Sequence, residues 1–159
     1  MNVSYPKKAF DFISIITRTD KPRTRGLTMV LEKGLGLRAA NELVLQSEYV
    51  DFVKFGWATP RLLSEEMMIR KIELYKQYGI AAGNGGTLLE IAYRQGKTAP
   101  FLEYCRTIGM EVIEVSNGVM QISASEKAHI IRTAHEMGFY VISEVGKKDP
   151  AEDLSLIHI

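Results

Sequence analysis

Residues 111–116 are EVIEVS and residues 139–145 are FYVISEV, two short apolar runs with one glutamate near the end of each. Alternate residues of a β-strand face opposite sides of the sheet. Glu114 and Glu144 therefore face away from their aliphatic neighbours, which would pack against helices. The two runs predict buried strands of an α/β protein, each with an ionisable group on the face away from the helices.

Outside these runs, the chain alternates predicted strands and helices at roughly thirty-residue spacing, as βα units require. Gly79, Gly109 and Gly138 each end a helical pattern just before an apolar run, which is typical of the loop from a helix into a strand. The expected strands are residues 27–31, 50–55, 80–82, 111–116 and 139–145. The expected helices are residues 37–44, 64–78, 87–94, 100–108 and 125–137.

Strands this apolar belong to a parallel sheet, either an open doubly wound sheet or a closed barrel. No glycine-rich dinucleotide motif follows the first strand. Near the carboxyl ends of the expected strands, ionisable residues occupy the positions that face away from the helices. In a barrel these strand ends converge on one mouth. The residues are Lys54, Glu114, Glu144 and Lys148. We predict a member of the TIM (β/α)8 barrel family, here an incomplete barrel of about five parallel strands with covering helices. A purely structural network of ion pairs is the alternative explanation of these charges.

Residues 83–87, GNGGT, follow the third expected strand and precede a helix. Glycines let backbone N–H groups approach an anion, and the N-terminus of a helix favours negative charge. We expect Gly85, Gly86 and Thr87 to bind substrate, with a flexible turn as the alternative.

The composition argues against several classes of protein. The 159 residues include 20 basic and 19 acidic side chains, and a net charge of +1 does not favour binding to nucleic acid or to a membrane surface. The single cysteine, Cys105, excludes an intrachain disulfide and falls in a helical pattern where a buried, unreactive thiol is expected. The first residues lack the apolar core of a signal peptide and no apolar run could span a bilayer, so we expect a cytoplasmic protein.

Several strings, in this order and spacing, resemble the phosphosulfolactate synthase family. KFGW and SEVGKK are the most specific of them. They are KPR (21–23), RGLT (25–28), DFVKFGW (51–57), GGTLLE (85–90) and SEVGKK (143–148). The resemblance implies a (β/α)8 barrel and a carbon–sulfur lyase that uses Mg²⁺ to add sulfite to phosphoenolpyruvate, in coenzyme M biosynthesis or sulfonate metabolism. It also implies that Lys148, which matches a lysine of the family, is the catalytic acid.

The other roles follow from residue chemistry once that reaction is assumed. Glu114 and Glu144 offer hard oxygen donors, so we expect them to hold Mg²⁺. The remaining expected contacts to substrate are Lys33, Lys54, Ser116 and Lys147. Phosphoenolpyruvate and sulfite are the expected partners, and a homo-oligomer is compatible with the sequence.

Two other functions stay open at this stage. A lysine at a strand end, such as Lys54, is also what an aldolase-type barrel uses to form a Schiff base. A non-catalytic, stress-related barrel of the same superfamily is the other alternative, although such a protein would be expected to lack the ionisable residues at the mouth.

Complete barrels of this kind run to about 250 residues. We therefore expect residues 1–153 to form part of a barrel, and this chain alone to be inactive. Residues 154–159, LSLIHI, correspond to the translation of a transposon-end adapter used in sequencing libraries, so we expect them to be a non-native tail.

Overall fold

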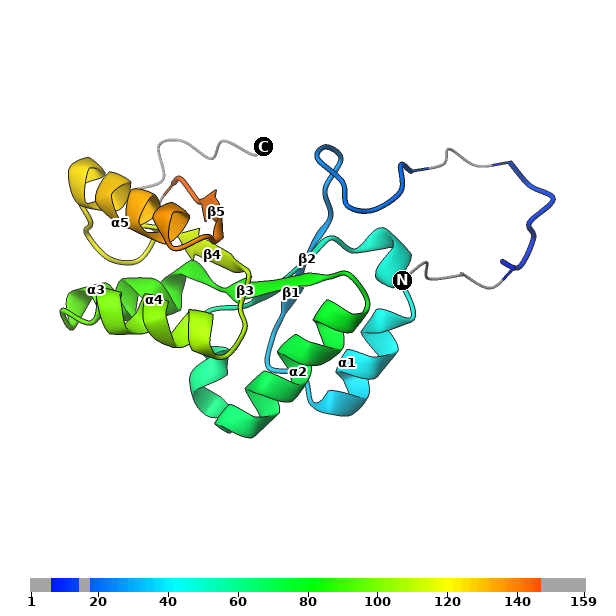
Figure 1. The fold of residues 1–159 in the computed structure, drawn as a ribbon, viewed down its shortest axis with the longest axis horizontal. Coiled ribbons are helices and arrows are strands. Elements are labelled where there is room, and N and C mark those ends of the chain that lie inside the picture. Colours follow the sequence, from blue (N-terminus) through cyan, green and yellow to red (C-terminus); the bar gives the residue numbers. More distant parts are fainter. Residues whose placement is uncertain (1–6, 15–17, 147–159) are drawn as a thin grey trace.

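The computed structural model describes residues 7–14 and 18–146, which contain one five-stranded parallel sheet with strands in chain order (Figure 1). The strands are β1 (Met29–Glu32), β2 (Phe52–Phe55), β3 (Ala81–Asn84), β4 (Val112–Val115) and β5 (Tyr140–Ser143). The helices are α1 (Leu37–Val44), α2 (Glu65–Gln77), α3 (Gly86–Arg94), α4 (Thr98–Thr107) and α5 (Ala124–Glu136), with 3-10 helices η1 (Ser47–Tyr49) and η2 (Thr59–Leu62). The α/β fold with five parallel strands and covering helices is confirmed. No helix of the described ranges could cross a membrane.

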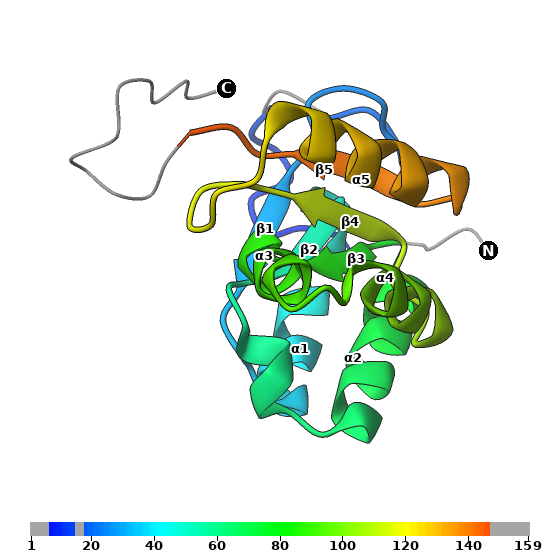
Figure 2. The same ribbon diagram turned by 90° about the vertical axis from the view of Figure 1, so that its left-hand side faces the viewer.

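Helices α1 to α4 gather on one side of strands β1 to β3, and α5 lies along β4 and β5 (Figures 1 and 2). On β2, Val53 and Phe55 are buried towards the helices, whereas Phe52 and Lys54 lie half-buried on the other face. The Phe52 ring stacks on Tyr140 of β5, with 5.1 Å between ring centroids. Since β2 and β5 are three strands apart, this contact shows that the sheet curls as a barrel wall does, while β1 and β5 are not paired with each other in the described sheet.

Most element boundaries differ from the expected ones by one or two residues. The third strand ends two residues later than expected, because β3 continues through Gly83 and Asn84, which pair with Lys54 and Phe55 of β2. The first two residues of the GNGGT segment are therefore strand, and its last two open α3.

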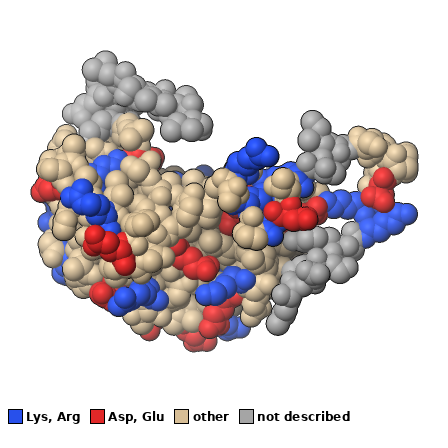
Figure 3. All heavy atoms as spheres, turned by 45° about the horizontal axis from the view of Figure 1, so that its top comes forward, with Lys and Arg blue, Asp and Glu red and all other residues tan. Residues whose placement is uncertain are grey.

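Charged side chains of both signs are interspersed over the face shown in Figure 3, and neither sign forms a continuous field there. This agrees with the near-neutral composition.

The KPR string that supports the family resemblance lies at the amino ends of the strands, opposite to the expected site. The Arg23 guanidinium donates to Asp51 Oδ1 at 2.8 Å and to the Glu48 carbonyl at 2.8 Å. The other Asp51 oxygen accepts the Thr28 backbone N–H at 2.8 Å and lies 3.3 Å from Arg18. These bonds tie the segment before β1 to the start of β2, so the string is structural.

One buried ion pair lies on the helix side of the sheet, at a residue just beyond the expected first strand. Glu32 of β1 faces the helices, and its carboxylate accepts a hydrogen bond from Lys71 of α2, both side chains being fully buried. The Lys71 ammonium also donates to the Leu35 carbonyl at 2.6 Å and lies 5.1 Å from the centre of the Phe55 ring. Glu32 in turn accepts the Leu35 N–H, so the pair anchors the loop after β1.

The buried Asp51 carboxylate predicts a loss of stability in acid. Burial opposes its ionisation, but the Thr28 N–H and the Arg23 guanidinium outweigh burial and hold its pKa below the ordinary value of 3.8. A lowered pKa stabilises the fold above pH 3.8, and this contribution is lost as the pH falls through the folded value. Urea unfolding should show that Asp51→Asn costs about 3 kcal/mol at pH 7 and progressively less below pH 3.8.

Glu66→Gln is the matched control, because the exposed Glu66–Arg70 pair should change the free energy of unfolding by less than about 0.5 kcal/mol. A cost for Asp51→Asn that stays constant down to pH 2 would contradict the role of this carboxylate.

Candidate active site at the carboxyl ends of the strands

An ion pair crosses the face of the sheet that the helices leave uncovered. Lys54 Nζ of β2 donates to Glu114 Oε2 of β4 at 2.7 Å. The strand between them carries Gly83, where a Cβ would lie 2.4 Å from the Val112 carbonyl oxygen, so β3 and β4 approach closely at this point. The Glu114 carboxylate is 3% exposed and the Lys54 side chain 20% exposed. The two strand charges predicted to share a face do so, and the ammonium keeps an opening to solvent.

The N-terminus of α3 holds an anion, and that anion belongs to the chain itself. The Gly86 N–H, at the first residue of the helix, donates to Glu114 Oε1 at 2.8 Å. The favourable helix dipole and an unsatisfied N–H thus stabilise a buried carboxylate. The Gly86 N–H, expected to contact substrate, thus donates to Glu114 in this structure, while Thr87 lies half-buried in the first turn.

Close packing explains why glycines occupy this turn. A Cβ on Gly85 would lie 2.6 Å from the Phe55 carbonyl oxygen, and one on Gly86 would lie 2.1 Å from Ser116 Oγ. The segment is a packed turn with neighbours on two sides, which does not agree with the alternative of a flexible turn.

Asn84 joins β3 to β4 where their backbones separate. Its amide nitrogen donates to the Glu114 carbonyl at 3.1 Å, and its amide oxygen accepts the Glu114 N–H at 3.0 Å. The side chain takes the place of a strand residue in the ladder, so the backbone of Gly85 can turn into α3. Glu114 is consequently fixed through its backbone as well as its carboxylate.

Glu90 is a buried residue at this end of the sheet that sequence reasoning did not identify. It is fully buried on α3, and its carboxylate accepts backbone N–H groups of the segment 116–120 after β4, which we call the β4 loop. It also accepts the Ser116 hydroxyl, so that Ser116 is buried and hydrogen-bonded within the protein. No local pattern marks Glu90 in the sequence, because the packing of α3 against β4 is a tertiary feature.

The other expected site residues lie around the same end of the sheet. Lys33 follows β1, is exposed, and has its ammonium 5.1 Å from the centre of the Trp57 ring. Glu144 follows β5 and is half-buried, and its N–H donates to the Val115 carbonyl at 3.1 Å. Lys147 and Lys148 lie outside the described residues.

The arrangement fits a divalent cation only in part. Among the described residues there is no group of three or more His, Cys, Asp or Glu side chains that could hold a metal. Both Glu114 oxygens already accept hydrogen bonds, one from a cation. A metal ion at Glu114 would have to displace the Lys54 ammonium, whereas Glu144 together with substrate oxygens and water is a set that Mg²⁺ accepts.

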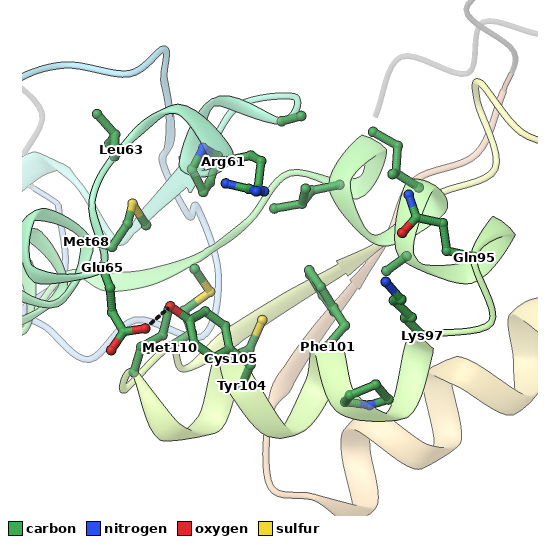
Figure 4. A pocket seen from close by; sticks show the side chains of 17 residues that line it. Arg61, Leu63, Glu65, Met68, Gln95, Lys97, Phe101, Tyr104, Cys105 and Met110 are labelled. Atoms are coloured by element: carbon green, nitrogen blue, oxygen red, sulfur yellow. Dashed lines mark hydrogen bonds between the residues drawn. The ribbon is translucent and has the colours of Figure 1, made fainter.

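A cleft of about 670 Å³ lies on the outer side of the protein, between α2, η2, α3 and α4 (Figure 4). Its lining is mainly apolar, and the hydrogen bond from Tyr104 to Glu65, 2.8 Å long, crosses one end. Cys105 lines it and is buried, as expected, and burial raises the pKa of this thiol to about 12. The cleft is on the helix side of the sheet, and the Lys54–Glu114 pair is on the other.

Comparisons with a family model and with curated proteins all point to one family. A family model described as (2R)-phospho-3-sulfolactate synthase (ComA) matches residues 16–158. The phosphosulfolactate synthase of Methanothermobacter thermautotrophicus is 43% identical over 146 residues, which cover 91% of this chain and 56% of that protein. Those of Methanocaldococcus jannaschii and Bacillus subtilis are 41% and 38% identical, over 94% and 86% of this chain and 57% and 54% of their own lengths. The chain spans about half the length of the curated relatives it matches.

The packed turn predicts that Gly86 will not accept a side chain. Gly86→Ala should lower the free energy of unfolding by about 1–3 kcal/mol, because the new methyl group must push Ser116 and Glu114 aside. Gly36→Ala is the matched control at the N-cap of α1, where a Cβ meets nothing within 4 Å, and its change should stay within about 0.5 kcal/mol. Equal effects of the two substitutions in urea unfolding would contradict the close approach.

Proposed function

Because this chain belongs to the phosphosulfolactate synthase family, we propose that the protein, at the full length of its relatives, adds sulfite to phosphoenolpyruvate and releases (2R)-phospho-3-sulfolactate. The observation that supports this most directly is the Lys54 ammonium, held by Glu114 at the mouth of a half-open barrel wall. Both substrates are anions, and a fixed cation at the carboxyl ends of parallel strands is suited to bind them.

The reaction needs positive charge to stabilise the intermediate and, in a later step, a proton at C2. The sulfur lone pair of sulfite forms the C3–S bond, and the π electrons of the C2–C3 double bond move towards C2 and the carboxylate. Cationic side chains fixed beside that carboxylate stabilise the developing charge. A proton is then delivered to C2, which completes the addition without a leaving group or a redox step.

We assign these tasks to the residues as follows. Lys54 and Lys33 bind the carboxylate or phosphate of the substrate, and Glu114 holds Lys54 in place. Lys148 delivers the proton to C2, and Lys147 contributes to anion binding. Mg²⁺, when bound, supplies further charge for the substrate carboxylate, and Glu144 is the residue that would hold it. A cytoplasmic location and a homo-oligomer remain predictions.

The test uses two proteins, this chain and the chain continued to the length of its relatives. Each is incubated with phosphoenolpyruvate, sulfite and Mg²⁺, and phosphosulfolactate is sought by mass spectrometry. We expect product from the longer protein and none from the chain alone. A folded longer protein that forms no product would overturn the proposed reaction, and borohydride trapping with carbonyl compounds would then examine the Schiff-base alternative at Lys54.

Two lysine substitutions in the longer protein should separate binding from proton transfer. Lys54→Met should raise the KM for phosphoenolpyruvate about tenfold or more, since it removes a charged hydrogen-bond donor. Lys148→Ala should lower kcat by about 10²-fold or more with little change in substrate affinity, because general acids contribute that much. Lys97→Met, at an exposed lysine of the outer cleft, is the control and should leave both constants unchanged. Unaltered turnover in Lys148→Ala would remove that residue from the mechanism.

A further inference from the structure

The β4 loop is held from two sides by charged side chains that are buried. On one side is Glu90 of α3, whose Oε2 accepts the Val119 N–H at 2.8 Å and also the Met120 N–H. Its Oε1 accepts the Gly118 N–H at 3.2 Å and the Ser116 hydroxyl. Four donors converge on one fully buried carboxylate. Burying a carboxylate costs free energy unless hydrogen bonds compensate for the lost water. The burial of Glu90 therefore depends on the loop, and the loop conformation depends on Glu90.

On the other side is Lys127, in the first turn of α5. Its ammonium donates to Asn117 Oδ1 of the β4 loop at 3.2 Å and to the backbone carbonyl of Glu144 at the end of β5. The side chain is buried, and a cation in the first turn of a helix opposes the helix dipole. Neither burial nor the helix favours a lysine here, and its two hydrogen bonds link the β4 loop to the end of β5.

These contacts connect three consecutive βα units at their carboxyl ends. The chain of bonds runs from Glu90 on α3 through the β4 loop to Lys127 and then to Glu144. These bonds hold two residues of the expected site, Ser116 by its hydroxyl and Glu144 by its backbone carbonyl. An active site whose groups are fixed before substrate arrives avoids reorganisation during the reaction.

We propose that Glu90 and Lys127 are positioning residues of the active site, which together hold the β4 loop and the end of β5 in the geometry that substrate binding requires. The proposal rests on the proposed function, since the groups they orient include Glu144 and the strand end that leads to Lys148. Neither residue touches substrate: each acts through the backbone it holds.

The first experiment measures the loop itself, in the whole 159-residue chain, by amide hydrogen exchange. Glu90→Gln keeps the shape of the side chain but weakens its capacity to accept, and Lys127→Met keeps the apolar stem but removes the donor. Exchange at the amides of residues 118–120 should rise about tenfold or more in Glu90→Gln, as expected for the loss of a hydrogen bond to a charged group. Glu103→Gln and Lys97→Met are matched controls on α4 and at its N-terminal end, both exposed, and should leave these amides unchanged.

The second experiment measures turnover in the protein continued to the length of its relatives. Glu90→Gln and Lys127→Met should each lower kcat/KM by about 10²-fold, the loss expected from a displacement of about 1 Å in a reacting group. Lys127→Arg should restore most of the activity, because its guanidinium can still donate to both oxygens. Asn117→Ala removes the hydrogen bond between the β4 loop and Lys127 but leaves the Lys127 ammonium bonded to the Glu144 carbonyl. This variant replaces Lys127→Met if that protein does not fold.

The outcomes separate the two proposals. Faster exchange together with reduced kcat/KM supports positioning. Faster exchange with unchanged kinetic constants overturns it and leaves Glu90 and Lys127 as structural residues only. Unchanged exchange shows that the loop does not depend on them, which also overturns it. If the unsubstituted longer protein forms no product, the proposed function fails, and the exchange data alone decide whether these residues hold the loop.

Discussion

The arrangement of the carboxyl ends of the strands depends on one constraint: a carboxylate buried away from water must find hydrogen-bond donors. Three glutamates meet this constraint with backbone N–H groups of the loops that follow the strands. Glu32 holds the loop after β1, Glu114 the turn into α3, and Glu90 the β4 loop. In two cases a lysine completes the pair, so each carboxylate is bound to both a loop and a cation. The loops that surround the mouth are thereby fixed from within the protein.

Much of the fold could be predicted from the sequence because the local signals agree with one another. Apolar runs and helix-ending glycines lead to the same alternation of strands and helices, and in the structure α2 has an N-cap at Ser64, whose hydroxyl accepts the Met67 N–H. The parity of the strand residues also placed Lys54 and Glu114 on one face. Glu32 lay just beyond the expected first strand, and its burial against Lys71 on the helix side was not predicted. Pairing between residues 39 positions apart has no local signature.

For the candidate site, the sequence predicted that Lys54 and Glu114 share a face, but not how Glu114 bonds to the glycine turn. Composition and spacing pointed to Lys54, Glu114 and the glycine turn, but suggested that the helix N-terminus and the carboxylate each await an external ligand. The structure shows that they bind each other. Glu90 was hidden because a glutamate on a short helix ordinarily lies in solvent, and only the tertiary fold turns it towards β4. Hydrogen-bond donors and acceptors can be identified in a sequence, but which of them bond to each other is decided by the tertiary fold.

The Asp51–Arg23 bonds lie at the amino ends of the strands, with the length of the sheet between them and the mouth. Inherited changes in this region would alter how much folded protein a cell maintains, while each folded molecule kept its affinity for substrate. Evolution could therefore change the amount of folded protein and the reaction it catalyses through different residues. A sequence string shared across a family can therefore be conserved because it stabilises the fold, without taking part in the reaction.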